Sequence, residues 1–344
     1  MYGGAVAWRN AAYDRGWATP ARLPCPVISV GNLTVGGTGK TACVELMTRK
    51  LQHHGKRVAI LSRGYGGRTK EYWLRVEHGE LLVNDGELPA DERLADEPQL
   101  LATHLPGTPV LVGARRAHMG RLACATFGCD ALVLDDGFQH RQLARDCDVV
   151  LIAARTDLSG LDVFPRGPLR EPLASLARAH VIIVTKANDA PAHADALMER
   201  LRAVNRDATL ATAVHEPSTL REEMTRYSHA VTELRGKQVG LLSSIGDPEG
   251  FAATVQRLHA TVLWHQRFPD HHRYREEDWR LIMARCAAAR PDVIVTTEKD
   301  WVRLRPYVGS PSAAPVPVWV LGIHMTLISG ERELDDRLAR LCAR

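Results

Sequence analysis

A glycine-rich turn between an apolar run and a helix-forming segment constrains the fold of this chain more than any other feature. The turn is Gly36-Gly-Thr-Gly-Lys-Thr41, and it comes a few residues after the apolar run Val27–Val30. Glycines allow the backbone to curve tightly, and a helix that begins here points free N–H groups and its positive dipole end at a phosphate. The order of strand, glycine turn and helix therefore predicts a phosphate-binding P-loop.

The predicted P-loop binds the phosphates of ATP through its backbone and two side chains. Lys40 is expected to reach the β- and γ-phosphates, and the hydroxyl of Thr41 to ligate Mg²⁺. The usual spacing has another glycine five positions before Gly39, where this chain has Thr34. Val35 precedes the glycine pair, which excludes the variant P-loop that uses a signature lysine. The predicted nucleotide-binding residues are Thr34, Gly36, Gly37, Thr38, Gly39, Lys40 and Thr41.

Two adjacent carboxylates form a second candidate site. The apolar run Ala131–Leu134 ends in Asp135 and Asp136. In a Walker B element a carboxylate at the end of such a strand helps to hold Mg²⁺. Two acids can also simply open a polar turn, but beside a P-loop the metal interpretation is favoured. We therefore predict Thr41, Asp135 and Asp136 as the metal residues.

Short apolar runs alternate with longer helix-forming stretches along the whole chain. The runs are continuously apolar, as expected for parallel strands that are buried on both faces. The sequence thus predicts a doubly wound, P-loop NTPase-like α/β fold with a mostly parallel sheet. The predicted strands are Pro26–Val30, Val58–Leu61, Ala131–Leu134, Asp148–Ile152, Val181–Val184, Val239–Leu242, Thr261–Trp264, Val293–Val295 and Val316–Val320, and the predicted helices include Lys40–His53 and Ala187–Arg206.

The chain of 344 residues is long enough for two α/β lobes. The polar stretch Glu216–Arg235 is the predicted junction between them. The predicted division is an N-terminal amphipathic segment at 1–22, a P-loop core at 23–215 and a second, smaller α/β lobe at 216–344.

The N-terminal segment combines aromatic residues with arginines. Trp8 and Trp17 lie close to Arg9 and Arg15, a combination that suits the headgroup region of an anionic bilayer. A helix that packs on the body of the protein explains the same pattern equally well. Contact with a membrane surface is therefore one of two interpretations of this segment.

Composition and charge narrow the classes of function. The net charge of +4 suits an anionic substrate or an acidic membrane surface, but it is too small to indicate a nucleic-acid partner, and we expect none. The seven cysteines are scattered, as is typical of a reducing compartment. No apolar run reaches the roughly 18 residues of a membrane span, and charged residues interrupt the N-terminus, so no signal peptide is expected. These features predict a cytoplasmic protein, with a monomer favoured.

A series of motifs resembles the tetraacyldisaccharide 4′-kinase (lipid A 4′-kinase) family in the same order along the chain. The most specific of them is Asp135-Asp-Gly-Phe-Gln-His140, whereas the bare P-loop is shared with unrelated proteins. Together they run from about residue 8 to the C-terminus. The matching segments are Ser29–Thr41, Leu61–Gly66, Asp96–Pro98, Asp135–Arg141, Phe164–Arg170, Val184–Lys186, Ile245–Pro248, Phe268–His272 and Thr296–Asp300.

The resemblance implies transfer of the ATP γ-phosphate to the 4′-hydroxyl of lipid A disaccharide 1-phosphate, giving lipid IVA. It implies two α/β lobes with the catalytic cleft between them, and a peripheral location on the cytoplasmic face of the bacterial inner membrane. Members of the family commonly carry a longer apolar stretch ahead of the segment that matches Ala5–Trp17.

The resemblance also implies roles for individual residues. It matches the catalytic aspartate to Asp96 and its histidine partner to His271, with Lys40 at the phosphates. A carboxylate can orient a sugar hydroxyl and accept its proton, and a histidine can hold that carboxylate. Several other residues are equally consistent with substrate contact and with an ordinary surface or turn position: Arg63, Tyr65, Arg115, Arg116, Arg141, Arg166, Arg170 and the segment Glu298–Asp300.

Two other classes of function also use a P-loop. One is a nucleotide-switched binding or assembly protein, in which a guanine-reading Asn-Lys-x-Asp is expected. The nearest match, Thr185-Lys-Ala-Asn188, lacks both the Asn and the Asp at the required places. The other is a soluble sugar or nucleoside kinase, which an assay of ATP consumption with and without the lipid acceptor distinguishes.

Overall fold

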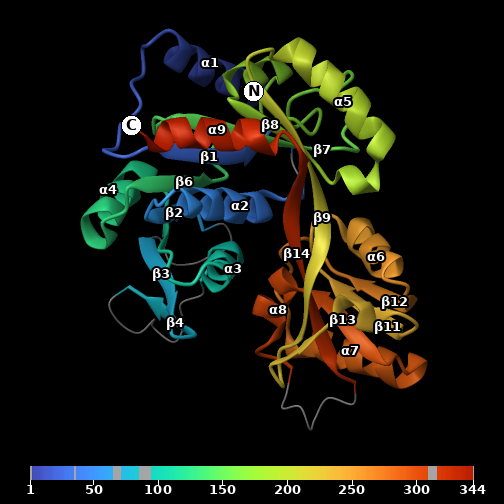
Figure 1. Cartoon of the computed structure of the whole chain (residues 1–344). Coiled ribbons are helices and arrows are strands. Elements are labelled where there is room, and N and C mark those ends of the chain that lie inside the picture. The colour runs from blue at the N-terminus through green and yellow to red at the C-terminus, as the bar shows by residue number, and fades with distance from the viewer. Residues whose placement is uncertain (1, 35, 65–70, 85–93, 309–315, 344) are drawn as a thin grey trace. The chain divides into compact units, whose positions relative to one another are not determined.

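The computed structural model describes residues 2–34, 36–64, 71–84, 94–308 and 316–343 (Figure 1). They form two compact units, the first made of Met1–His215 and Met325–Arg344 and the second of Glu216–His324. The chain enters the second unit within strand β9 (Thr209–Glu222) and returns within strand β14 (Val318–Ser329). The domain division at 23–215 and 216–344 stays a prediction, but residues 325–344 group with the first unit, which the sequence did not indicate.

The first unit is built on a mostly parallel sheet with the order β9-β8-β7-β1-β6-β2-β5-β3-β4. All neighbours from β9 to β5 are parallel, and the edge strands β3 and β4 are antiparallel. The strands are β1 Val27–Asn32, β2 Val58–Ser62, β3 Glu71–Glu77, β4 Glu80–Val83, β5 Val110–Gly113, β6 Ala131–Asp135, β7 Cys147–Ala153, β8 Val181–Thr185 and the first part of β9.

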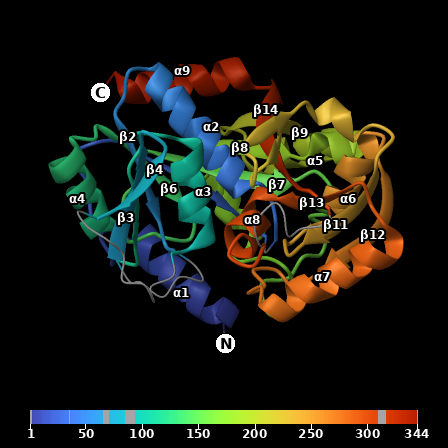
Figure 2. The same cartoon turned by 90° about the horizontal axis from the view of Figure 1, so that it is seen from below.

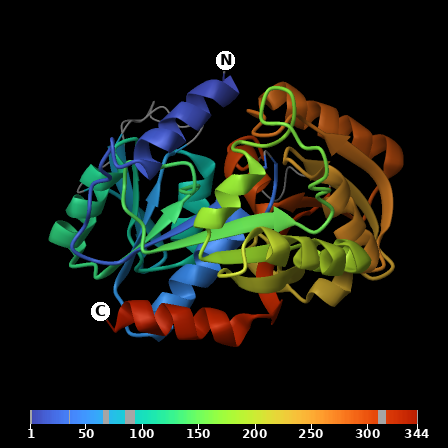
Figure 3. The same ribbon diagram turned by 90° about the horizontal axis from the view of Figure 1, so that it is seen from above.

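Helices cover both faces of this sheet. In β7, Val149 and Leu151 pack in a core cluster with residues of α2 and α9, whereas Val150 and Ile152 pack with residues of α5. The helix α2, which follows the P-loop, lies beside α9 (Figures 2 and 3). The helices of this unit are α1 Tyr2–Asp14, α2 Lys40–His53, α3 Asp96–His104, α4 Arg116–Phe127, η1 Leu173–Arg178, η2 Ala187–Asp189, α5 Pro191–Val204 and α9 Glu331–Cys342.

In the second unit the strand order is β12-β11-β13-β14-β9, and β10 pairs antiparallel with β9. The core of this unit lies on both sides of β11, since Leu242 packs with α7 and Leu241 packs with α6. The additional elements are β10 Tyr227–His229, η3 Val231–Leu234, β11 Gln238–Ser243, α6 Pro248–Arg257, β12 Thr261–Arg267, α7 Glu276–Ala289, β13 Val293–Thr297 and α8 Glu298–Leu304.

The predicted α/β class with a mostly parallel sheet is confirmed, and the helix predicted over Lys40–His53 has those bounds. The predicted junction Glu216–Arg235 stays a prediction: the second unit begins at Glu216, and the stretch holds the end of β9 and the strand β10. One helix prediction was wrong in detail. The single helix expected over Ala187–Arg206 is two, because Pro191 has no N–H to continue the preceding turn and instead begins α5.

Candidate active site

The glycine loop adopts a shape that a larger residue at Gly39 would disrupt. Gly39 has a φ of 86°, in the left-handed region, and it stands immediately before the first residue of α2. A Cβ atom at this position would collide with the imidazole ring of His215. The sequence motif did not indicate His215, because it is distant in the chain and carries no local pattern.

Side chains from two neighbouring strands hold the loop in place. At the end of β1, Asn32 donates from Nδ2 to Thr38 Oγ1 at 3.1 Å. At the end of β8, Thr185 donates from Oγ1 to the carbonyl oxygen of Thr38 at 2.9 Å. Thr38 is therefore buried and fixed by its neighbours, and the predicted loop residue Thr34 is buried as well. Val35, Tyr65 and Gly66 lie outside the described residues.

Lys40 meets one of the two predicted acids. Its Nζ lies 3.5 Å from Asp136 Oδ1, and Arg170 Nη1 contacts both carboxylate oxygens of Asp136 at 2.9 and 2.8 Å. Burial alone would raise the pKa of Asp136, but Lys40 and Arg170 outweigh it and lower the pKa. Asp136 is therefore ionised and shared between two cations at the mouth of the P-loop.

Asp135 has a different environment although it is the adjacent residue. It is 4% exposed, and Ser62 Oγ at the end of β2 donates to its Oδ2 at 3.0 Å. Burial, followed by the charges of Glu97 and Asp136, raises its pKa to about 7. The structure thus places a buried, incompletely compensated negative charge beside the loop, which is an environment suited to a cation ligand.

A group of arginines lies close to these carboxylates in the first unit. Arg116 is 4% exposed and donates from Nη1 to the carbonyl oxygen of Gly113 at 2.8 Å. Burial and the nearby Arg63 lower its pKa to about 10. Burial, together with arginines that include Arg116, also lowers the pKa of His140 to about 4. Buried positive charge of this kind suits an anionic ligand.

The two residues of the implied acid–base pair belong to different units. Asp96 is the first residue of α3 in the first unit, where an acid is favourable at the helix N-terminus. His271 belongs to the second unit, has a φ of 57° and donates its backbone N–H to the carbonyl oxygen of Ser244 at 3.2 Å. Their pairing stays a prediction.

The segment Glu298–Asp300 contributes a buried carboxylate to the second unit. Asp300 is fully buried, and its Oδ1 accepts hydrogen bonds from the backbone and hydroxyl of Ser244 at 3.0 and 2.6 Å and from the Tyr274 hydroxyl at 3.0 Å. Thr297 donates to its Oδ2 at 2.7 Å, and Arg303 donates to Oδ1 at 2.9 Å. Asp300 therefore braces the loop whose Ser244 carbonyl accepts the His271 N–H.

The N-terminal helix is attached to segments that hold site residues. Asn10 donates to the buried carboxylate of Glu171 at 2.6 Å, and Glu171 directly follows Arg170. Arg141 binds the carbonyl oxygen of Asn10 and the carboxylate of Asp14. Other side chains of the segment face outwards, since Trp8 is 71% and Trp17 67% exposed.

Among the described residues, neither a preformed cluster of metal ligands nor a membrane-spanning helix is present. There is no group of three or more His, Cys, Asp and Glu side chains placed to hold a metal ion, so the metal prediction rests on Thr41 and the Asp135–Asp136 pair. No helix in the described part of the chain is both long and apolar enough to cross a membrane.

Comparisons with known proteins agree over the whole chain. A family profile described as "Tetraacyldisaccharide-1-P 4'-kinase" matches residues 1–343. The tetraacyldisaccharide 4′-kinase of Anaeromyxobacter dehalogenans (strain 2CP-C) is 42% identical over 338 residues, which cover 97% of this chain and 86% of that protein. Its counterpart from Syntrophus aciditrophicus (strain SB) is 39% identical over 313 residues, or 89% of this chain and 82% of that protein. The crystal structure of LpxK from Aquifex aeolicus in complex with ATP matches with a TM-score of 0.74 and 30% identity, covering 99% of this chain and 96% of that one.

A parallel strand, a glycine loop with its lysine, and acids at the end of a neighbouring strand define a P-loop nucleotide-binding protein, and the comparisons place it among the kinases. Within that class, the chain belongs to the tetraacyldisaccharide-1-phosphate 4′-kinase family. The resemblance stated from the motifs is thereby confirmed.

Proposed function

We propose that this chain transfers the γ-phosphate of ATP to the 4′-hydroxyl of a tetraacyldisaccharide 1-phosphate. The observation that carries the proposal is the contact of Lys40 with Asp136 at 3.5 Å beside the glycine loop, in a chain that matches the family over residues 1–343. The products are the 1,4′-bisphosphorylated lipid and ADP.

The loop and Lys40 bind the nucleotide. Backbone N–H groups at the start of α2 face the phosphates, and Lys40 offsets the negative charge that develops on the transferring group. Thr34 and residues Gly36–Thr41 shape this pocket. Preorganisation by Asn32 and Thr185 holds the loop before the nucleotide arrives.

Thr41, Asp135 and Asp136 are the proposed Mg²⁺ residues. Their hydroxyl and carboxylate oxygens are the donors that Mg²⁺ prefers, and the raised pKa of Asp135 reports negative charge that a cation would relieve. When bound, the metal supplies charge neutralisation at the β- and γ-phosphates. Asp136 is already held by Lys40 and Arg170, so we assign Asp135 as the carboxylate closer to the metal.

Asp96 is the proposed general base and His271 its partner. Asp96 accepts the proton of the 4′-hydroxyl while the hydroxyl oxygen forms its bond to the γ-phosphorus. The bond from the γ-phosphorus to the bridging oxygen breaks, and ADP leaves with that electron pair. His271 orients the Asp96 carboxylate.

Because the acceptor is a lipid, the enzyme must bind it at a membrane surface, and we assign α1 to contact with that surface. The exposed Trp8 of this helix and the exposed Trp17, which follows its end, are suited to the headgroup region of an anionic bilayer. The buried contact of Asn10 with Glu171 attaches the same helix to the protein body, so the two interpretations of the segment are compatible.

ATP consumption with and without detergent-dispersed disaccharide 1-phosphate tests the proposed activity. The lipid should accelerate ADP release and acquire the phosphate at the 4′ position. Lipid-independent hydrolysis would favour a nucleotide-switched protein, and activity on a free sugar or nucleoside would favour a soluble kinase.

A further inference from the structure

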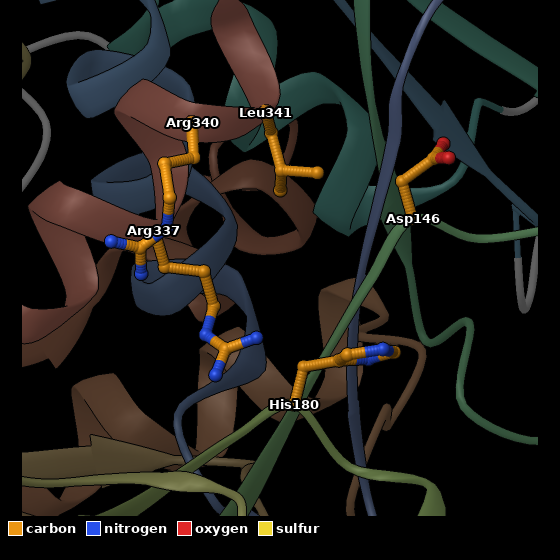
Figure 4. A pocket seen from close by; sticks show the side chains of 5 residues that line it. All are labelled: Asp146, His180, Arg337, Arg340 and Leu341. Atoms are coloured by element: carbon orange, nitrogen blue, oxygen red, sulfur yellow. The ribbon is translucent and has the colours of Figure 1, made fainter. Parts of the chain in front are cut away.

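A hollow of about 250 Å³ opens where α9 meets the amino ends of two central strands (Figure 4). It is lined by Asp146 and His180, which directly precede β7 and β8, and by Arg337, Arg340 and Leu341 of α9. The strands are parallel, so this edge of the sheet is opposite to the carboxyl edge that holds the P-loop and Asp135. The seven residues of β7 separate the two edges by roughly 20 Å, so the hollow is no part of the nucleotide site.

The two arginines of the hollow have no anionic partner within the part of the chain that is described. Arg337 donates only to Thr209 Oγ1, at 3.3 Å, and Arg340 is exposed without a hydrogen bond or ion pair. The neighbouring Arg145 differs, because Asp148 pairs with it at 3.1 Å. The two guanidinium groups that line the hollow are therefore still able to bind an anion.

His180 adds a hydrogen-bond donor. Its Nδ1 accepts the backbone N–H of Asp148 at 3.0 Å, so the neutral ring carries its proton on Nε2. Burial lowers the pKa of His180, and the charges of Arg337 and Arg145 lower it further. The ring is therefore a neutral N–H donor beside the guanidinium groups.

One carboxylate also lines the hollow and opposes an anion. Asp146 Oδ2 accepts the backbone N–H of Val27 at 2.8 Å, which uses part of its acceptor capacity but leaves its charge. The two arginines and Asp146 give the hollow a formal charge of one positive unit. The expected ligand is therefore bound weakly, and removing the Asp146 charge should strengthen its binding.

A larger hollow of about 530 Å³ shares Thr209, the partner of Arg337. Arg202, Arg206 and Glu333 line it, and neither arginine forms an ion pair among the described residues. The two arginines and Glu333 give this hollow one net positive charge, and it offers room for the remainder of a ligand whose anionic group binds Arg337 and Arg340.

We infer that Arg337, Arg340 and His180 form a second anion site, specific for a phosphate monoester or free phosphate. Paired guanidinium groups bind phosphate oxygens in two-pronged geometry, and a neutral imidazole N–H completes the donor set. The site goes beyond the proposed kinase activity. It also has a physical link to the P-loop helix, because Glu331 and Asp335 of α9 bind Lys50 of α2 at 2.7 and 2.9 Å.

Thermal unfolding of the full chain, with the P-loop saturated by ADP, tests this site. Sodium phosphate replaces sodium chloride at constant ionic strength, and a ligand that binds the folded chain raises Tm. The wild type should be stabilised by phosphate. Arg337→Gln or Arg340→Gln should weaken the apparent affinity about 10-fold, and Asp146→Asn should strengthen it about 3-fold. Arg285→Gln, the same change at an exposed arginine of α7, should leave the affinity unchanged.

A second arm distinguishes the source of the phosphate. Vesicles containing phosphatidic acid are compared with vesicles of phosphatidylcholine alone, using the wild type and the Arg340→Gln variant. A response to inorganic phosphate assigns the site to free anions, and a response that only phosphatidic acid elicits assigns it to a lipid headgroup. The inference is overturned if neither probe acts, or if Arg340→Gln and Arg285→Gln respond alike. Within the described part of the chain Arg340 forms no hydrogen bond or ion pair, so Arg340→Gln should fold and keeps the test valid even if Arg337→Gln does not fold.

Discussion

Each unit of this protein has a buried carboxylate at or shortly after the end of a parallel strand, and the two carboxylates differ in how many hydrogen-bond donors surround them. After β13 in the second unit, Asp300 receives hydrogen bonds from Ser244, Tyr274, Thr297 and Arg303 and is completely buried. At the end of β6 in the first unit, Asp135 has one side-chain donor among the described residues, Ser62, and a raised pKa.

The comparison separates a carboxylate that stabilises the fold from one that is prepared for a ligand. A buried charge with a full set of donors is retained because each donor would otherwise be unsatisfied. A buried charge without that set destabilises the unliganded protein, and a bound cation can reverse the effect. Similar motif positions in sequence thus have different physical roles.

The largest effect is expected for Lys40→Ala. Loss of the cation beside Asp136 should lower kcat by about 10³-fold, because the charge on the transferring phosphate is no longer offset. Steady-state kinetics at saturating lipid would measure it, with Lys56→Ala as a matched control that keeps wild-type turnover. A folded Lys40→Ala enzyme with near-normal kcat would remove the P-loop from the mechanism.

Substitution of the proposed base should have the next largest effect. Asp96→Asn should lower kcat by about 10²-fold while ATP binding changes little, because the loop and Lys40 bind the nucleotide. If Asp96 and His271 act together, the double variant with His271→Ala should be little worse than Asp96→Asn alone. Fully multiplicative losses would show that the two residues act independently.

The two strand-end carboxylates should respond in opposite directions to the same substitution. Asp300→Asn should reduce the free energy of unfolding by about 3 kcal/mol, because several donors lose a charged acceptor. Asp135→Asn should raise the unfolding temperature at pH 8 without Mg²⁺, since it removes a buried charge whose folded-state pKa is raised to about 7. Equal destabilisation of both variants in thermal unfolding would contradict the comparison.

A smaller effect is expected from His140 as the pH falls. Its pKa is about 4 in the folded state against an ordinary value of 6.5, because of burial and the arginines near it. Between pH 6.5 and pH 4 the unfolded chain binds more protons than the folded chain. The stability contributed by neutral His140 is therefore fully present above pH 6.5 and is lost as the pH falls from 6.5 to 4. His140→Gln should reduce the fall in Tm between pH 6.5 and pH 5 by about 3 °C. An unchanged pH profile would exclude His140 as a contributor.

The smallest effect is expected from the exposed tryptophans of the N-terminal segment. Replacing Trp8 and Trp17 with Ser should weaken sedimentation with anionic vesicles several-fold and leave ATP binding unchanged, because both rings are largely exposed. Tyr227→Ser, which replaces another exposed ring, is the matched control. Phe127→Ser is unsuitable because the Phe127 ring packs on Trp73. Equal sedimentation of the double variant and the wild type would contradict the membrane assignment.

The features that the sequence predicted correctly are those that local residue order specifies. The P-loop, the helix Lys40–His53 and the strand before Asp135 are local features, in which residue order alone specifies the backbone. The sequence predicts Asp136 as a metal residue. Its ion pairs with Lys40 and Arg170 depend on tertiary contacts and do not follow from local sequence. The same is true of Ser62 at Asp135 and of the hydrogen bonds around Asp300.

Two further features, the edge strands β3 and β4 and the packing of the C-terminal helix α9 on the first unit, are not predicted by local sequence patterns. Strand β3 has Arg75 between apolar residues, and β4 is only four residues long and begins with Glu80, so neither matches the continuous apolar runs that indicated the central strands. The last helix, α9, packs with the first unit through Leu334 and Leu338, although it follows the second unit in the chain. Its place depends on long-range packing that a local pattern does not encode.

Transfer of labelled γ-phosphate from ATP to the purified disaccharide 1-phosphate tests the proposed activity most directly. The wild-type chain should move the label to the 4′ oxygen in an amount equal to the ADP formed, and Lys40→Ala should leave the lipid unlabelled. Release of the label as inorganic phosphate, with the lipid unmodified, would contradict the assignment of this chain as a lipid kinase.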